Sequence, residues 1–357
     1  MNCSEVTQLV DTFYKEEVRK RKKEAQGFYN RMLAICTIAC FVGYLGLVHT
    51  ATQYQTISNI LSSDRSLLIF CLPIYLGASL YYLMTLLHDY VHATSYYSPT
   101  ARFVIEYIVP ILMPMNPAGY RWGHFQHHSN TNRFSEEFDT LPPVILEKNL
   151  TAFCLNCLVH SVAVLAIFVV RILINPLMML SKKTRLIYFN YVSSLGKISP
   201  RAYPIRNNSK EFNKNFIGNL ISLSALTLFW AMSGFSMVFV ALYLVSLAIA
   251  SAWVAFRSLV DHACIDVIGK EEVTKANFYY TSNFDNAHFW YAGFATHHLI
   301  HHINPSIPHY FCEELNDLIC EKVPEYQNLH QRRNSLPLVI KDFYGAEATE
   351  SELLKTV

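Results

Sequence analysis

Eight histidines of this 357-residue chain fall into three short clusters with helical spacing. In an α-helix, side chains at positions i, i+3 and i+4 lie on one face, so each cluster would present its imidazoles together. Imidazole is the commonest side-chain ligand for transition metals, and eight exceed what one ion needs when positions stay open for other ligands. The clusters therefore predict two metal ions bound between helices. They are His88 and His92 in H-D-Y-V-H, His124, His127 and His128 in H-F-Q-H-H, and His298, His301 and His302 in H-L-I-H-H.

One such pair is weak evidence by itself, because histidines at i and i+4 are also typical of a solvated helix surface. Three clusters in one chain favour metal binding. Ligating imidazoles commonly donate their other N–H to a carboxylate, and Asp89, Asp139 and Asp261 lie close to the clusters in sequence. Adjacent residues on a helix point about 100° apart. We therefore expect Asp89 to serve a histidine of another cluster, or solvent, in preference to His88.

The elements that carry these histidines are expected to lie in a membrane. The chain is 52% hydrophobic and 16% charged, whereas about a quarter of residues are charged in soluble domains. Four apolar stretches reach the length of about 17 to 25 residues that a helix needs to cross a bilayer. The sequence therefore predicts an all-α integral membrane protein with four transmembrane helices in two hairpins. The stretches are 32–48, 67–87, 216–232 and 235–256.

Basic residues predict the orientation, because cytoplasmic segments near helix ends are rich in lysine and arginine. Seven basic residues precede or open the first span, including those of the run 19–23, while the loop after it holds only Arg65. The N-terminus is therefore expected in the cytoplasm, and both hairpins return the chain there. This topology places the three histidine clusters and both termini in the cytoplasm, with the clusters in a helical cap.

One further apolar segment, residues 152–170, conflicts with this topology if it spans the membrane. A fifth crossing would move the eight basic residues of 175–215 outside and separate the third histidine cluster from the others. The segment is therefore interpreted as a re-entrant, interfacial or protein-buried helix. Between the prolines of 101–119, short apolar helices are expected instead of a span. The expected organisation is a basic cytoplasmic leader at 1–27, a membrane domain at 28–312 and a cytoplasmic tail at 313–357.

Helix length adds a ninth candidate ligand. At a rise of about 1.5 Å per residue, His88 and His92 stand within about 8 Å of the end of the second span. If the fourth span continues as a helix, His262 stands about 9 Å beyond Phe256. These matching heights favour His262 as a ligand over a surface histidine bonded to Asp261. Imidazole-rich sites with open positions suit iron, copper or zinc.

Four segments resemble the histidine boxes of the membrane fatty acid desaturase superfamily, which includes lipid desaturases, hydroxylases and carotenoid ketolases. Their order and their spacing from the apolar stretches match over about residues 28–312. The resemblance implies a four-span membrane fold with a cytoplasmic cap, a non-haem diiron centre, and dioxygen-dependent oxidation of a lipid acyl chain. The segments are H-D-Y-V-H at 88–92, H-F-Q-H-H at 124–128, R-S-L-V-D-H at 257–262 and H-L-I-H-H-I-N-P-S-I-P at 298–308.

Carried over residue by residue, the resemblance implies nine iron ligands and no catalytic residue beyond them. His297 is an alternative to His298, because positions 297 and 301 are also four apart, but only His298 completes H-x-x-H-H. His288 is a candidate neighbour of the ligand set. The implied ligands are His88, His92, His124, His127, His128, His262, His298, His301 and His302, and structural roles are assigned to His49, His160, His309 and His330.

The resemblance favours a fatty acid desaturase that introduces a double bond. The chain has no H-P-G-G segment of a fused cytochrome domain, which implies an external electron donor of the cytochrome or ferredoxin type docking on the basic cytoplasmic face. The other expected partners are a lipid substrate and the membrane, either a bacterial inner membrane or the endoplasmic reticulum. No nucleic-acid partner is expected.

Two other enzyme classes remain as alternatives. The same centre suits a hydroxylase or ketolase of a carotenoid, alkane or sphingolipid chain. A more remote alternative is an intramembrane zinc protease, since H-D-Y-V-H differs from H-E-x-x-H only by aspartate for glutamate. A metal transporter or sensor would carry histidines inside the spans, whereas here they lie beyond the span ends.

Overall fold

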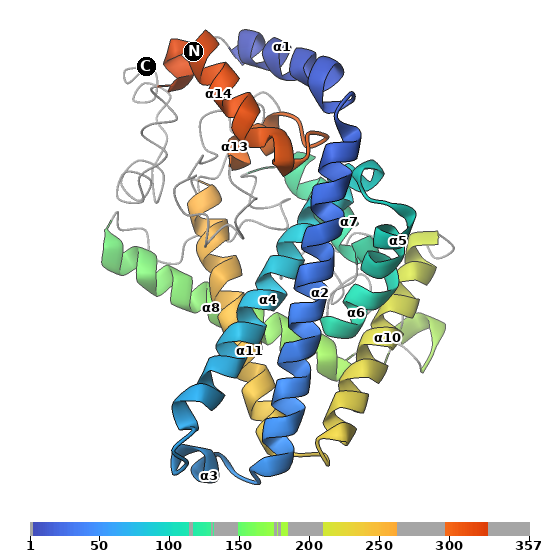
Figure 1. Cartoon of the computed structure of the whole chain (residues 1–357), viewed down its shortest axis with the longest axis vertical. Helices are drawn as coiled ribbons and strands as arrows, with labels where there is room; N and C mark the ends of the chain where they lie inside the picture. The colour runs from blue at the N-terminus through green and yellow to red at the C-terminus, as the bar shows by residue number, and fades with distance from the viewer. Residues whose placement is uncertain are drawn as a thin grey trace.

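In the computed structural model, every regular element of the described residues is a helix (Figure 1). The all-α prediction is therefore confirmed over these residues. The predictions for Asp139, His288, His330 and residues 328–357 lie outside them. The structure describes residues 3–113, 117–129, 131, 149–174, 177, 180–184, 210–262 and 297–327.

Four long helices run along the longest axis of the molecule (Figure 1). They are α2 (Lys22–Gln53), α4 (Ser66–Ala93), α10 (Lys210–Met232) and α11 (Met237–Asp261). Because α4 packs against both α2 and α11, it lies at the centre of this bundle, and α10 packs against α2 and the short helix α6 (Val109–Leu112). Each predicted span falls within one of these helices, except that α11 begins at Met237 instead of residue 235.

The turn between α10 and α11 has a local sequence cause. Gly234 and Phe235 adopt left-handed backbone conformations with φ of 69° and 58°, and glycine enters this region without a steric penalty. Ser236 then caps α11, since its hydroxyl oxygen accepts a hydrogen bond from the Val238 N–H at 3.2 Å. These residues reverse the chain after Met232 and form the second hairpin predicted from the sequence.

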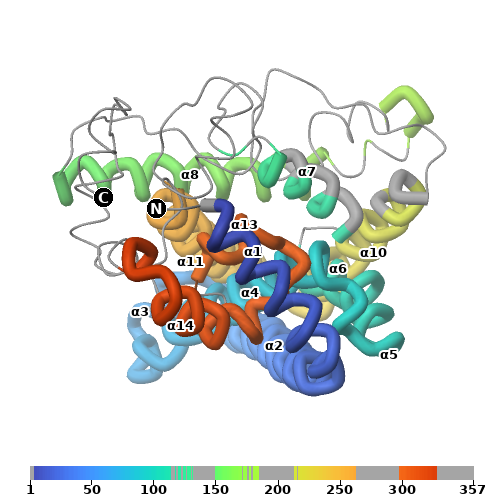
Figure 2. The backbone as a smooth tube through the Cα atoms, turned by 90° about the horizontal axis from the view of Figure 1, so that it is seen from above, coloured from blue at the N-terminus to red at the C-terminus, as the bar shows by residue number. Residues whose placement is uncertain are grey.

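Four helices are long and apolar enough to cross a membrane by length and composition, namely α2, α4 with its extension to Tyr96, α8 (Leu150–Ile174) and α11. The apolar part of α10, Phe216–Met232, is shorter. Helix α8 contains the segment 152–170 and packs on α11, but it lies across the bundle and not along it (Figures 1 and 2). The described chain is therefore built as a membrane protein, in which α8 is oriented differently from α2, α4, α10 and α11.

Helices α4 and α11 approach each other closely at Gly77. A Cβ atom at this position would lie 2.7 Å from the backbone oxygen of Ser246 and 2.8 Å from the side chain of Ile249. No real Cβ atom is tolerated at such distances, so only glycine allows the two helices to lie this close. This contact sets the separation of two helices whose ends carry histidines.

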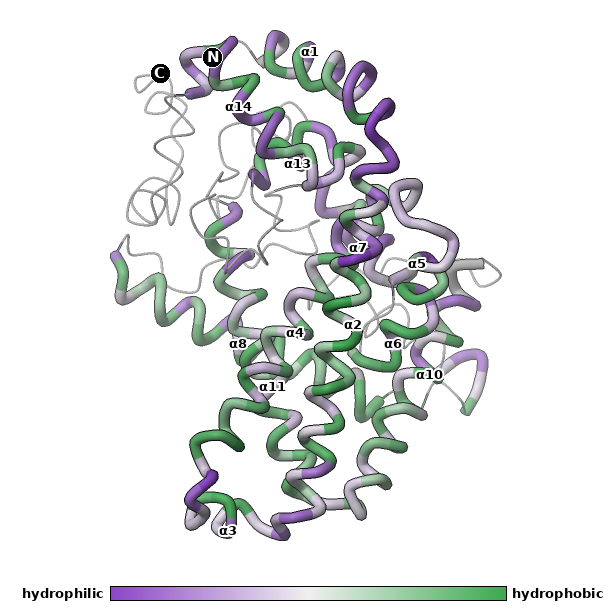
Figure 3. Tube along the Cα trace, viewed as in Figure 1, coloured by the Kyte–Doolittle hydropathy of each residue, from purple (hydrophilic) through white to green (hydrophobic). Residues whose placement is uncertain are grey.

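The end of the molecule that carries α1 (Cys3–Phe13) and α14 (Cys312–Lys322) is more polar than the opposite end (Figure 3). Short helices form much of it, as predicted for 101–119. Proline lies in the first turn of α5 (Pro99–Phe103), α6 and α7 (Pro117–Ser129), where its missing N–H costs no hydrogen bond. The remaining elements here are η2 (Thr94–Tyr96), η3 (Val104–Ile108), α13 (His298–Ile303) and η5 (His309–Phe311).

The N-terminal leader packs against the chain that follows the third histidine cluster. Helix α1 contacts α14, and the Arg21 guanidinium bonds to the Glu314 carboxylate at 2.6 Å. The same guanidinium lies 5.1 Å from the centre of the Phe311 ring. The predicted leader and the start of the predicted tail therefore form one packed layer over the histidines.

Candidate metal centre

All the histidines of the three clusters lie at the polar end of the bundle. His88 and His92 are in the last turns of α4, and His262 directly follows the last residue of α11. Helix α7 carries the second cluster and α13 carries the third. Segments separated by more than 200 residues of sequence therefore meet at one place, where the apolar helices end.

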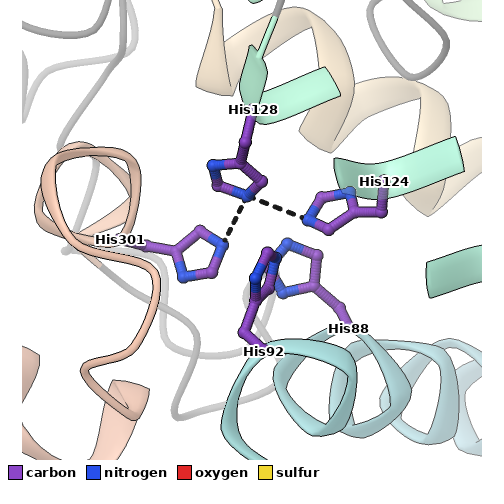
Figure 4. A group of neighbouring side chains, drawn as sticks. All are labelled: His88, His92, His124, His128 and His301. Atoms are coloured by element: carbon purple, nitrogen blue, oxygen red, sulfur yellow. Dashed lines mark hydrogen bonds between the residues drawn. The ribbon is translucent and has the colours of Figure 1, made fainter. Parts of the chain in front are cut away.

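The nine histidines proposed from the sequence lie in two groups, each able to hold a metal ion. Within a group, the candidate ligand nitrogens all lie within 4.8 Å of one another. Figure 4 shows the first group, with side chains from α4, α7 and α13 directed toward a common centre. The five-histidine group consists of His88, His92, His124, His128 and His301, and the four-histidine group of His127, His262, His298 and His302.

Helical geometry explains which imidazole joins which group. Residues four apart on a helix point about 40° apart, whereas residue i+3 points about 60° to the other side of residue i. Each i,i+4 pair accordingly stays within one group, and the i+3 residues His127 and His301 join the group opposite to their own cluster's pair. Helices α7 and α13 therefore each contribute to both groups. The pairs are His88 with His92, His124 with His128, and His298 with His302.

The nitrogen separations fit two imidazoles bound to one ion. At metal–nitrogen bonds of about 2.0–2.1 Å, neighbouring ligand atoms lie about 2.9–3.4 Å apart in octahedral or tetrahedral geometry. In the five-histidine group, the Nε2 atom of His128 lies 3.1 Å from the Nε2 atoms of both His124 and His301. In the four-histidine group, the Nε2 atom of His298 lies 3.1 Å from that of His302 and 3.3 Å from that of His262.

Burial keeps these imidazoles in the form that binds metals. Desolvation lowers the pKa of His128, His301 and His302 well below the usual value, and neighbouring imidazoles lower it further. A neutral ring has a free lone pair, which a metal ion requires. In addition, the Nε2 atom of His92 is buried without a hydrogen-bond partner among the described residues. A metal ion would satisfy this nitrogen, so the donor set fits the expected cofactor.

The two groups are in direct contact. The rings of His128 and His302, one from each group, have centroids 4.4 Å apart and an interplanar angle of 30°. The rings of His88 and His298 lie 6.1 Å apart. Two ions held by these groups would therefore be neighbours in one centre and not two remote sites.

The two aspartates that adjoin the ligand candidates bond to different partners. Asp261 forms an ion pair with Arg257 at 2.9 Å and lies 3.8 Å from the Nε2 atom of His298. Asp89 bonds to the Nδ1 atom of His309 at 2.7 Å. As expected, Asp89 does not bond to His88, but its partner His309 belongs to none of the three clusters. The position of His309 in I-P-H-Y-F has no helical spacing that could have revealed this contact.

The remaining described histidines lie outside both groups. His297 is buried at the start of α13 with a left-handed φ of 58°, and the four-histidine group contains His298 instead. His49 is exposed on α2, and His160 is buried on α8.

The fatty acid desaturase family model matches residues 65–334, a segment that contains all nine histidines of the two groups. The match covers more than half of the chain. Comparison with curated proteins and with solved structures gives no match.

Proposed function

Since the chain belongs to the fatty acid desaturase family, we propose that it oxidises a lipid acyl chain at a non-haem diiron centre and introduces a double bond. The family implies an oxidoreductase that acts on lipid at a membrane. The observation that carries the diiron proposal is the pair of adjacent histidine groups, five residues in one and four in the other. A zinc protease needs one ion with about three protein ligands and would leave most of these imidazoles without a role.

In this proposal, each histidine group holds one iron ion. The five-histidine group surrounds the first ion and the four-histidine group the second. Among the described residues, neither group includes a cysteine or a carboxylate. Nitrogen-rich sites with open positions suit a redox metal better than magnesium or calcium, which prefer oxygen ligands. The bound iron supplies the activation of dioxygen needed to remove hydrogen from an unreactive carbon.

The chain's own residues hold and shield the centre. Seven of its nine histidines have relative exposures of 8% or less, namely His88, His124, His127, His262, His298, His301 and His302. The leader and α14 pack together above α13. This layer would keep bulk water away from the ions, as oxidation of an unreactive chain carbon requires. The reaction also needs electrons, which we assign to an external donor protein.

We further propose that the histidine end of the bundle faces the cytoplasm. The basic run at 19–23 lies at that end, where lysine and arginine accumulate on the cytoplasmic side of membrane proteins. In this arrangement α2, α4, α10 and α11 cross the membrane and α8 is interfacial or re-entrant, an interpretation supported by its orientation across the bundle (Figure 2). The domain boundaries at 27 and 312 belong to the same proposal.

A product assay tests the proposed reaction. Cells expressing the chain are supplied with ¹⁸O-labelled dioxygen, and their lipids are compared with those of cells expressing His301→Ala. We expect a new carbon–carbon double bond, two mass units lighter than the substrate and free of ¹⁸O, only with the native chain. An ¹⁸O-labelled alcohol or ketone would instead establish a hydroxylase or ketolase on the same centre. Identical lipid profiles together with one zinc ion per chain would overturn the diiron proposal.

A further inference from the structure

A buried carboxylate next to the metal centre bonds to an imidazole that belongs to neither histidine group. Asp89 follows His88 on α4, yet its Oδ1 atom lies 2.7 Å from the Nδ1 atom of His309 on η5. The side-chain exposures of His309 and Asp89 are 0% and 1%. A contact this short between fully buried groups, 220 positions apart in sequence, joins the end of α4 to the chain that follows the third cluster.

The His309 ring lies against two histidines of the five-histidine group. It stacks on the His301 ring with centroids 4.7 Å apart and an interplanar angle of 22°. It also lies 5.6 Å from the His88 ring. Both neighbours are members of the five-histidine group, so His309 extends that group by one further ring without joining its set of close nitrogens.

Among the described residues, no group makes the contact to His301 or His88 that normally orients a ligating histidine. A ligating imidazole usually donates its second ring N–H to a carboxylate or carbonyl, which fixes the plane of the ring. The Nδ1 atoms of His88 and His301 are buried and have no hydrogen-bond partner among the described residues. Within the described residues, packing therefore orients these two rings. Of the nearly parallel rings against His301, that of His309 lies nearest, at 4.7 Å, compared with 5.6 Å for His298.

His309 can serve as a fixed surface because Asp89 is itself held in place. The Tyr29 hydroxyl on α2 lies near the Asp89 carboxylate and accepts the N–H of Tyr310 at 3.2 Å. The Tyr97 ring stacks on Tyr29 with centroids 4.9 Å apart. Helices α2, α4 and η5 therefore meet beside Asp89, and close packing of these buried side chains allows them little freedom of movement.

We propose that the buried Asp89–His309 pair is a positioning device for the five-histidine group. Asp89 fixes the plane of His309, and the His309 ring fixes the orientation of His301 and supports His88. Carboxylates usually orient a ligating histidine directly, whereas here the carboxylate acts through one additional ring. The inference rests on the proposed diiron function, because it treats His88 and His301 as iron ligands.

The test compares two substitutions of Asp89 in the full-length protein loaded with ⁵⁷Fe. Asp89→Asn keeps an oxygen that can accept the His309 N–H, whereas Asp89→Leu has a similar volume and no acceptor. We expect Asp89→Leu to lower turnover per bound iron pair by about 10–100-fold, the usual cost of losing an orienting partner. Its Mössbauer spectrum should show a changed quadrupole splitting for one iron only. Asp89→Asn should recover most of the rate and the native spectrum.

A second variant covers the case in which Asp89→Leu fails to fold. In His309→Asn, the amide N–H replaces the Nδ1 donor and keeps Asp89 bonded, but the ring face against His301 is lost. We expect His309→Asn to bind two irons and to show the same change in the quadrupole splitting of one iron as Asp89→Leu. His160→Gln is the matched control, since His160 is a buried histidine on α8 outside both groups, and its spectrum should equal that of the native protein.

Three results would count against the proposal. Native doublets and native turnover per iron pair in both Asp89→Leu and His309→Asn would leave the pair with a purely structural role. Loss of one iron from His309→Asn would make His309 a ligand and not a positioning residue. If the native protein itself binds no iron pair, the diiron function fails and this inference fails with it, whereas the first two results leave the diiron function standing.

Discussion

The two histidine groups both contain residues of α7 and α13 but differ in the third helix that supplies ligands, which is α4 for one group and α11 for the other. Helices α7 and α13 contribute to both groups. The five-histidine group gains an i,i+4 pair from α4, which remains helical through Ala93, whereas the four-histidine group gains only His262. His262 has extended backbone angles, φ −128° and ψ 145°, because α11 ends at Asp261. The two groups therefore differ in ligand number because α4 supplies two histidines and the end of α11 supplies one.

The largest predicted effect is loss of activity, and the iron that each variant loses distinguishes the two groups. His92→Ala and His262→Ala should each abolish lipid oxidation, because the reaction needs both ions. Each variant should lose mainly one iron, and the remaining Mössbauer doublet should differ between the two variants. Iron analysis of purified membrane protein measures this, with His160→Ala as a control that keeps both ions and the native rate. Retention of two irons and full activity in either variant would remove that residue from its group.

Acidification should destabilise the iron-free protein through histidines of both groups. The folded protein holds His301 and His302 neutral, with pKa values well below the usual value, whereas the unfolded chain takes up protons below a pH of about 6.5. Since the unfolded state then binds more protons, the free energy of unfolding falls as pH decreases from about 6.5 toward the folded-state pKa values. Thermal unfolding in detergent at pH 8 and pH 5.5 tests this. A higher midpoint at pH 5.5 would contradict it.

The contact that spaces α4 from α11 should affect stability more than iron content. Gly77→Ala forces apart the helices that end in His88 and His262, and overpacking of this kind costs about 1–3 kcal/mol. Gly27→Ala is the control, because its Cβ would lie no closer than 3.5 Å to the Arg31 side chain, and the alanine should stabilise α2 by up to about 1 kcal/mol. Chemical unfolding of both variants measures the difference. Equal stabilities would show that α4 and α11 have room to separate.

The smallest predicted effect tests which histidine begins the third cluster. His297 has a left-handed backbone conformation, which asparagine tolerates better than most residues. His297→Asn should therefore keep two irons and change the free energy of unfolding by no more than about 1 kcal/mol. His298→Asn, by comparison, should lose the iron of the four-histidine group. The opposite pattern would assign position 297 to the centre.

Much of this centre could be predicted from local spacing. Histidines four apart on a helix share a face wherever the helix lies, so the pairs 88 and 92, 124 and 128, and 298 and 302 were evident from the sequence. Helix rise alone also placed His262 at the height of His88. The contact between Asp89 and His309 had no such signal, because η5 is a single short turn whose direction depends on its packing against α2.

The sequence by itself determined the helices, the hairpin turn at Gly234 and the identity of the nine clustered histidines, because backbone geometry and side-chain spacing act over a few residues. Only the tertiary structure decided how the imidazoles divide into groups of five and four, that α8 lies across the bundle, and that His309 supports His301. These features depend on the angles and distances at which separate helices pack, and contacts such as that of Gly77 with Ser246 set those distances only once the chain has folded.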